Sequence, residues 1–279
     1  MEEIFTVLDE KLSYPIQILF SVFSKETPSF FSYAVIFAFG LVVGSFANVC
    51  IGRLPVGNGI VYTPSFCPYC KTKLEWWQLI PLLSQLLLRR CYWCRRPISF
   101  RYFFVELWYG VFFAYNYYLF GLSTKFVVST ALIALLTVAF FTDLERQIIP
   151  DEINILGAAA FVLLGVFMKA SGVVAFASGE SMITGAVVLA LIFWAIVVLS
   201  GGGMGMGDVK LAALIGAALG VERGLASVFL AFLIGGVYAL VVLLFGARRR
   251  KDYIPFGPFL VVAVILEVWG LNPLHWLRF

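Results

Sequence analysis

The chain is a succession of long apolar runs joined by short polar stretches. The runs lie at residues 33–52, 103–120, 125–142, 153–168, 181–199, 209–221, 225–246 and 255–271. Most of them reach the roughly 17–25 residues that a helix needs to cross a bilayer, whereas the sixth is short and indicates a tilted or broken helix. The pattern therefore predicts an all-α polytopic membrane protein with about eight transmembrane helices.

The composition agrees with a membrane protein. Hydrophobic residues make up 62% of the 279 positions and charged residues only 13%, whereas soluble globular proteins are about half apolar and about a quarter charged. Lipid is therefore the expected solvent, and the net charge of +4 does not indicate a nucleic-acid partner. Residues 1–32 carry acids such as Glu2 and Glu3 where a signal peptide would be basic, so we expect a non-cytoplasmic acidic leader there.

The basic residues indicate how the chain is oriented in the membrane. If the N-terminus lies outside, 14 of the 20 Lys and Arg residues fall in cytoplasmic segments. These are Arg53, Lys71, Lys73, Arg89, Arg90, Arg95, Arg96, Arg101, Arg146, Lys210, Arg248, Arg249, Arg250 and Lys251. Cytoplasmic loops are enriched in Lys and Arg, so this orientation is favoured. The connections after the third and fifth spans then both face the cytoplasm.

These two connections carry the candidate catalytic acids. In "FFTDLERQIIPDEINI", Asp143 ends the third span and Asp151 follows Pro150, where the next helix is expected to begin. In "SGGGMGMGDVKLA", Asp208 opens the sixth span. An acid beside hydrocarbon is costly and therefore a functional candidate by default. Asp143 and Asp208 are predicted to lie at the same membrane face.

Two carboxylates that meet in a site of low dielectric share one proton, which is the arrangement of an aspartic protease. One acid takes a proton from water while the other polarises the scissile carbonyl. Gly205 and Gly207 have no side chains, so they would let a substrate backbone approach and could adopt unusual dihedral angles. From the residues alone, helix capping explains Asp208 equally well, because Asp is a favoured N-cap residue.

The cysteines indicate a metal site. "CPYC" holds Cys67 and Cys70, "CYWC" holds Cys91 and Cys94, and 20 residues separate the two pairs. This is the spacing of a four-thiolate structural zinc site. The alternatives are two redox pairs or unligated thiols, but a cytoplasmic loop does not favour disulfides. The fifth cysteine, Cys50, lies within the first span and is expected to serve packing.

At this point the motifs resemble a known family, the bacterial prepilin peptidases or type 4 prepilin-like leader peptidases, which are GxGD-type intramembrane aspartic proteases. The resemblance rests on segments between Gly44 and Pro258 that occur in the family's order. They are "GSFANVCIGRLP", "PSFCPYCKTKL", "IPLLSQLLLRRCYWCRRPIS", "RYFFVELWYG", "TDLERQIIPDEIN", "GMGMGDVKL" and "IPFGPFL". The resemblance implies that Asp143 and Asp208 are the catalytic pair, because the family motif places the first acid before the proline and so selects Asp143 over Asp151.

The resemblance also implies a substrate, a cofactor and a location. The substrates would be type IV prepilins or type II secretion pseudopilins, whose short basic leader is removed after a glycine at the cytoplasmic face of the bacterial inner membrane. Members with the cysteine loop generally also methylate the new N-terminus with S-adenosylmethionine, and no residue here identifies the methyl-donor site. The expected organisation is a leader at 1–32, the first transmembrane helix at 33–52, a cytoplasmic zinc-binding loop at 53–101 and a membrane-embedded peptidase core at 102–279.

Two other classes of protein also fit part of this sequence. Intramembrane acids beside glycine-broken helices also suit an ion-coupled transporter, with the zinc loop as a regulatory module. A non-catalytic assembly factor with a zinc-held docking loop is a further alternative. Glu106 is a second membrane acid, for which a structural role is favoured, paired with Arg101 or a loop arginine.

Overall fold

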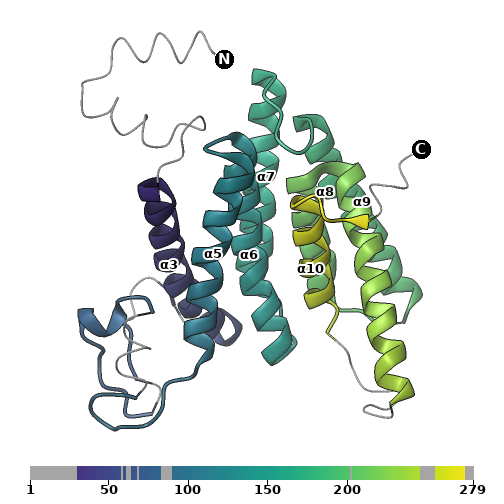
Figure 1. Ribbon diagram of the computed structural model, residues 1–279. Coiled ribbons are helices and arrows are strands. Elements are labelled where there is room, and N and C mark those ends of the chain that lie inside the picture. Colours follow the sequence, from purple (N-terminus) through teal and green to yellow (C-terminus); the bar gives the residue numbers. More distant parts are fainter. Residues whose placement is uncertain are drawn as a thin grey trace, which may run out of the picture. The chain divides into compact units, whose positions relative to one another are not determined.

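The computed structural model describes residues 30–57, 59–60, 64–67, 69–82, 90–201, 203–245 and 255–273, so most of the predicted leader lies outside the described residues. Apart from two isolated β-bridges, the regular structure of this part is helical (Figure 1). The α-helices are α3 (Phe30–Arg53), α5 (Arg101–Phe120), α6 (Thr124–Arg146), α7 (Asp151–Ser171), α8 (Gly179–Leu199), α9 (Met206–Leu244) and α10 (Gly257–Val268). Two short 3-10 helices cover Leu54–Val56 and Trp76–Leu79.

The apolar runs predicted as spans are helical. In the described part of the chain, 5 helices are long and apolar enough to cross a membrane: Phe30–Val56, Thr124–Arg146, Asp151–Ser171, Gly179–Leu199 and Met206–Leu244. The 20-residue helix α5 is not among them, and α10 is a shorter apolar helix of 12 residues. The prediction of an all-α multi-pass membrane protein is confirmed, while the number of eight spans stays a prediction.

The described residues form two compact units. The first comprises the described residues within Met1–Phe46 and Phe66–Val127, and the second those within Ala47–Ser65 and Val128–Phe279. Within the first unit, α3 and α5 approach closely at two glycines. A Cβ at Gly40 would lie 2.6 Å from the carbonyl oxygen of Tyr109, and one at Gly44 would lie 2.9 Å from the Cα of Glu106. Small residues allow such backbone contact, which drives helix association where lipid removes the hydrophobic effect.

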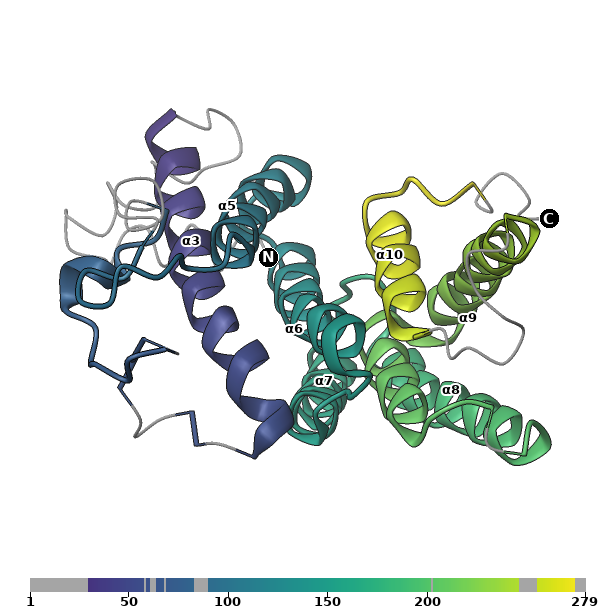
Figure 2. The same cartoon turned by 90° about the horizontal axis from the view of Figure 1, so that it is seen from below.

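Close glycine contact also joins α8 to α9 in the second unit. A Cβ at Gly185 would lie 2.5 Å from the carbonyl oxygen of Gly216, so neither position has room for a side chain. Around this contact α9 packs against α7, α8 and α10, as the two views of the fold show (Figure 2). The arrangement fixes the position of the first half of α9, which carries Asp208.

The long helix α9 is two helices joined at Gly220. Gly220 has φ 77° and ψ −176°, which is not helical and is accessible at low cost only to glycine. The chain folds back there, since a Cβ at Gly224 would lie 3.6 Å from the Cα of Gly216. The Ser181 hydroxyl accepts the Val221 N–H at 3.2 Å and so satisfies a donor freed by the break. The predicted sixth and seventh runs correspond to these two halves.

Candidate active site and metal centre

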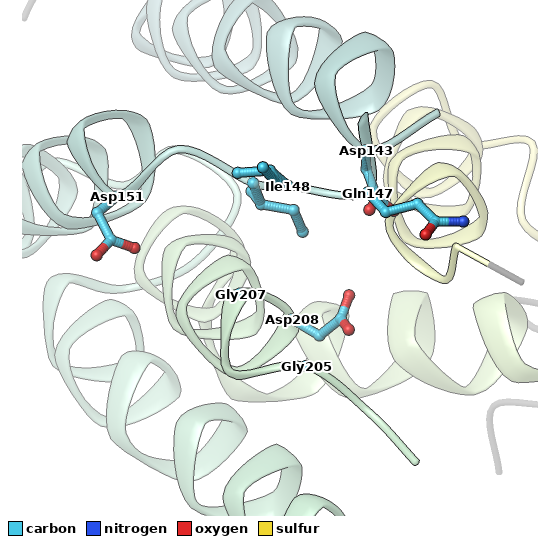
Figure 3. A pocket seen from close by; sticks show the side chains of 8 residues that line it. Asp143, Gln147, Ile148, Asp151, Gly205, Gly207 and Asp208 are labelled. Atoms are coloured by element: carbon cyan, nitrogen blue, oxygen red, sulfur yellow. The ribbon is translucent and has the colours of Figure 1, made fainter. Parts of the chain in front are cut away.

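The two predicted catalytic acids line one pocket. Asp143 lies in the last turn and a half of α6, and Asp208 lies in the first turn of α9. Both are only 3% exposed. They share a pocket of about 210 Å³ with Gln147 and Asp151 (Figure 3). The sequence predicts that these acids lie at the same membrane face, and the structure brings them together in one pocket of the second unit.

Local sequence explains why α6 ends beside the pocket. Gln147 follows the last helical residue, Arg146, and has φ 55°, a left-handed conformation that stops an α-helix. Pro150 is the N-cap of the next helix, α7. Its ring disfavours helical geometry in the residue before it, so the chain stays non-helical up to this point. The non-helical segment 147–150 therefore crosses the pocket, and Ile148 and Ile149 from this segment help to line it.

Asp143 is held by the N-terminus of α10. The backbone N–H of Gly257, the first residue of this helix, donates to Asp143 Oδ2 at 3.0 Å. The contact leaves no space at Gly257, where a Cβ would lie 2.7 Å from the same oxygen. The N-terminus of α10 therefore fixes the position of the Asp143 carboxylate.

Asp208 has different surroundings. Its Oδ1 atom is buried and has no hydrogen-bond partner in the described part of the chain. The carboxyl is near enough to Asp143 for a direct charge–charge interaction. Figure 3 shows the Asp208 side chain directed to the side of the pocket where Asp143 and Gln147 lie. The two acids thus face the same space: Asp143 receives a donor from the N-terminus of another helix, and Asp208 lies at the N-terminus of its own, where the backbone of Gly205 bonds to its carboxyl.

Asp151, the competing candidate, occupies the rim. Its side chain is 57% exposed, and its Oδ1 pairs with Lys210 Nζ at 2.6 Å. Its side chain points away from Asp143 and Asp208 in Figure 3. The pair connects the first turns of α7 and α9, so Asp151 has an ion-pair partner, which the two buried acids lack among the described residues.

The two glycines of the GxGD motif lie against the pocket without unusual dihedral angles. Gly205 is the N-cap of α9 with φ −81° and ψ 153°, a conformation open to any residue, and Gly207 is helical. The expectation of special backbone geometry at Gly205 is therefore wrong. Close approach remains the relevant property, because a Cβ at Gly207 would lie 3.3 Å from the Cβ of Ile149.

The four cysteines of the two CxxC pairs form one cluster in the first unit. Their sulfur atoms all lie within 4.8 Å of one another. Two sulfur–sulfur distances join one CxxC pair to the other: Cys67 Sγ to Cys94 Sγ and Cys70 Sγ to Cys91 Sγ are each 3.8 Å apart. A tetrahedron of sulfurs around zinc with Zn–S bonds of about 2.3 Å has edges of about 3.8 Å, so the cluster fits this ion. The redox-pair alternative loses support, because the cysteines are free and the close sulfurs belong to different pairs.

Each CxxC pair is built by the same turn. In the first, the Cys67 N–H donates to the Thr72 carbonyl and the Lys71 N–H donates to the Cys67 carbonyl, both at 2.9 Å. In the second, Cys91 makes the corresponding bonds with Arg96 and Arg95 at 2.9 and 3.0 Å. The hydroxyl and the N–H of Thr72 lower the pKa of the Cys70 thiol to about 6. Donors directed at sulfur favour the thiolate, which is the metal-binding form.

Glu106 holds part of the cysteine-containing segment. Its side chain is buried, and Oε2 accepts the N–H of Leu82 at 2.8 Å, with the Ser45 hydroxyl also in reach. Leu82 has φ 58°, an uncommon conformation for leucine. The structural role predicted for Glu106 agrees with these contacts, but the expected arginine partner is replaced by a backbone N–H. Cys50 is buried, as expected for a packing residue.

Sequence reasoning missed two contributors to the site. Gly257 acts through its backbone, and the only signal for it was its place between Phe256 and Pro258 in "IPFGPFL". Lys210 was counted as a topology signal, although its spacing of two residues after Asp208 places it on the same helical turn. Both lie in motifs that were already singled out.

Comparison with known proteins agrees with the site. Residues 38–120 match the Bacterial Peptidase A24 N-terminal domain, and residues 130–240 match the Type IV leader peptidase family. A prepilin leader peptidase/N-methyltransferase of Legionella pneumophila is 30% identical over 276 residues, covering 88% of this chain and 94% of the relative. One from Bacillus subtilis is 33% identical over 235 residues, covering 84% and 92%. No solved structure gives a significant match. The chain belongs to the prepilin leader peptidase/N-methyltransferase family of enzymes.

Proposed function

We propose that this enzyme removes the leader from type IV prepilins or type II secretion pseudopilins with Asp143 and Asp208 as its catalytic residues. The observation that carries the proposal is the pair of buried carboxylates lining one pocket at the ends of α6 and α9. The family names of the relatives supply the substrate class. Cleavage is proposed to follow a glycine, beside a hydrophobic helix of the substrate.

Hydrolysis requires attack of a water molecule on the scissile carbonyl, together with proton transfers to and from the two carboxyl groups. One carboxylate takes a proton from water, and the water oxygen bonds to the scissile carbonyl carbon. The other carboxyl, protonated, donates to the carbonyl oxygen and stabilises the tetrahedral intermediate. Collapse of the intermediate breaks the C–N bond, and the amine leaves with a proton from the dyad. Asp143 and Asp208 share the pocket in which a water molecule and a carbonyl would have to meet.

The pocket has features that suit an extended peptide. Segment 147–150 is not helical, so backbone groups near Ile148 and Ile149 are available to an incoming strand. On the opposite side, Gly205 and Gly207 place backbone without side chains beside Asp208. A substrate backbone held between these two segments would bring its carbonyl to the dyad.

The second proposed reaction is methyl transfer from S-adenosylmethionine to the new N-terminal amine. The name of the relatives supports it, as does the four-cysteine cluster. We assign zinc to Cys67, Cys70, Cys91 and Cys94. Four thiolates fill a tetrahedral ion, so the zinc would hold the loop together and leave no position for water or substrate. The residues that bind the methyl donor stay unassigned.

The proposed orientation places the dyad toward the cytoplasm in the bacterial inner membrane. The excess of Lys and Arg in the segments at that side supports it. The proposed organisation keeps an outer leader at 1–32, a first span at 33–52, a zinc-binding loop at 53–101 and the peptidase core at 102–279. Eight spans belong to the same proposal.

The transporter alternative is not favoured. Family membership assigns the chain to enzymes, and the two acids lie together at the ends of α6 and α9.

The test is incubation of the purified protein with a prepilin, followed by mass measurement of the product N-terminus. Leader removal shortens the substrate at one peptide bond. Adding S-adenosylmethionine should then increase the product mass by one methyl group in place of hydrogen. An intact substrate after prolonged incubation with well-folded enzyme would contradict the proposed peptidase.

A further inference from the structure

The geometry points to an asymmetric dyad: the N-terminus of α10, acting through the Gly257 N–H, keeps Asp143 as the ionised base, and Asp208 carries the shared proton. Gly257 is then a positioning residue for the peptidase reaction. The inference rests on the proposed function. It adds an assignment of the two acids to the steps of the reaction.

The first argument is the donor to Asp143. The Gly257 N–H reaches Asp143 Oδ2 at 3.0 Å in a buried position. The N–H groups of the first helical turn have no partner within their own helix, and the helix dipole places partial positive charge there. A backbone donor and a helix N-terminus both favour an ionised carboxylate over the neutral acid. Asp143 is therefore the acid that can best hold the negative charge of the pair.

The second argument is the contrast with Asp208. Asp208 also lies in the first turn of a helix, and the backbone of Gly205 bonds to its carboxyl, but its Oδ1 is buried with no hydrogen-bond partner in the described residues. An ionised carboxylate leaves such a buried oxygen unsatisfied, whereas a protonated one can donate a hydrogen bond from it. With one proton between two neighbouring acids, the proton is therefore assigned to Asp208, whose buried Oδ1 has no donor.

The third argument is the identity of residue 257. A Cβ there would lie 2.7 Å from Asp143 Oδ2 and 3.2 Å from Asp143 Cγ. Gly257 is helical, with no positive φ, so its backbone conformation does not require glycine. Glycine is needed at this position because only a residue without a side chain lets the Asp143 carboxylate reach the N–H of residue 257. Any larger residue would displace the base from its position.

This asymmetry assigns the proton movements. Asp143 removes a proton from the attacking water, and the water oxygen bonds to the scissile carbon. Asp208 gives its proton to the carbonyl oxygen as the C=O double bond opens. When the intermediate collapses, the oxygen returns its proton to Asp208, the C–N bond breaks, and Asp143 passes its proton to the leaving amine. Both acids end in their starting states.

The test compares Gly257→Ala with Gly236→Ala, a matched control whose added Cβ would meet nothing within 4 Å. We expect Gly257→Ala to lower the cleavage rate by about 100-fold, the loss associated with a misplaced catalytic group. We also expect the acid limb of its pH–rate profile to move to higher pH, because the displaced base gains a proton more easily. Gly236→Ala should cleave at the rate and with the pH profile of the unmodified enzyme.

A backbone ester at position 257, introduced in place of the amide by nonsense suppression, removes the donor without adding a side chain. The same shift of the acid limb is expected. An unchanged pH profile in both variants, or normal cleavage by Gly257→Ala, would overturn the inference. Assay of Asp143→Asn in parallel separates this outcome from failure of the proposed function. If Asp143→Asn cleaves, Asp143 is not catalytic and the proposed function fails. If Asp143→Asn is inactive while Gly257→Ala cleaves normally, only the asymmetry of the dyad is wrong.

Discussion

Replacing each carboxylate by its amide should separate catalysis from folding, because the two acids have different surroundings. Asp143→Asn keeps an oxygen that can accept the Gly257 N–H, but a neutral acceptor replaces a charged one. Hydrogen bonds to charged groups contribute about 1.5–3 kcal/mol and neutral ones about 0.5–1.5, so the free energy of unfolding should fall by about 1 kcal/mol. Asp208→Asn loses no hydrogen bond at Oδ1 and should change stability by less than that.

The effect on catalysis should be much larger. Positioned acid–base groups contribute about 10²–10⁴ in rate. Each tenfold loss corresponds to about 1.36 kcal/mol, so the barrier should rise by roughly 2.7–5.4 kcal/mol in either variant. Single-turnover cleavage of a prepilin, followed by mass spectrometry, measures the rate, and thermal unfolding measures stability in the same preparation.

The matched control is Asp151→Asn. It removes an exposed ion pair with Lys210, which contributes at most about 1 kcal/mol. Substantial cleavage should remain. The reasoning is refuted if Asp143→Asn or Asp208→Asn cleaves within about tenfold of the normal rate, or if Asp151→Asn is inactive while Asp143→Asn cleaves normally.

Three further predictions concern other parts of the molecule. Gly207→Leu should reduce cleavage by about tenfold or more, since the first added carbon already lies 3.3 Å from Ile149; a normal rate in the folded variant would remove the close-approach argument. The protein should contain one zinc per chain by elemental analysis, and Cys91→Ser should lower zinc content and harm methyl transfer more than cleavage; four reactive thiols without metal would disprove the site. Glu106→Ala should lower the free energy of unfolding by about 1–3 kcal/mol and speed hydrogen exchange at Leu82, whose N–H loses its acceptor. Glu106→Gln keeps an acceptor, so equal exchange rates in the two variants would contradict this role.

Features that depend on local pattern could be predicted from the sequence. The apolar runs located the helices, since a membrane helix needs a continuous apolar stretch. The spacing of the cysteines anticipated their clustering, because a CxxC turn directs two sulfurs to one point. Asp143 and Asp208 stood out because acids are rare beside membrane helices.

Features that depend on backbone groups from distant segments could not be predicted. Every residue except proline has an N–H, so nothing in the sequence marks that of Gly257 as the donor to Asp143, 114 residues away. For the same reason Glu106 was assigned an arginine partner when the structure gives it the Leu82 N–H. The gap between the runs at 209–221 and 225–246 predicts a break in this region, but the sequence does not identify Gly220 as the residue of the turn, since glycine is also common in straight membrane helices.

The break in α9 sets the level of the two acids along the second half of that helix. Asp208 is 12 residues before Gly220 and Phe232 is 12 residues after it, so each lies about 18 Å along its half from the turn. The Phe232 ring contacts that of Phe256 at 4.8 Å between centroids, which places Phe232 level with the start of α10 and hence with Asp143. The second half continues through Leu244 with exposed apolar side chains such as Val237 and Leu240.

Apolar surface suited to lipid therefore continues along α9 for about another 18 Å beyond the level of the acids. If the proposed dyad hydrolyses a peptide there, the space around Asp143 and Asp208 must be a hydrated recess below the surrounding headgroups. Its depth then depends on the thickness of the bilayer, because a helix accommodates a thicker membrane by tilting or by local thinning of the lipid. The cleavage rate should therefore depend on the acyl-chain length of the lipids. Enzyme reconstituted in thin bilayers should admit water and substrate more readily than the same enzyme in thick ones.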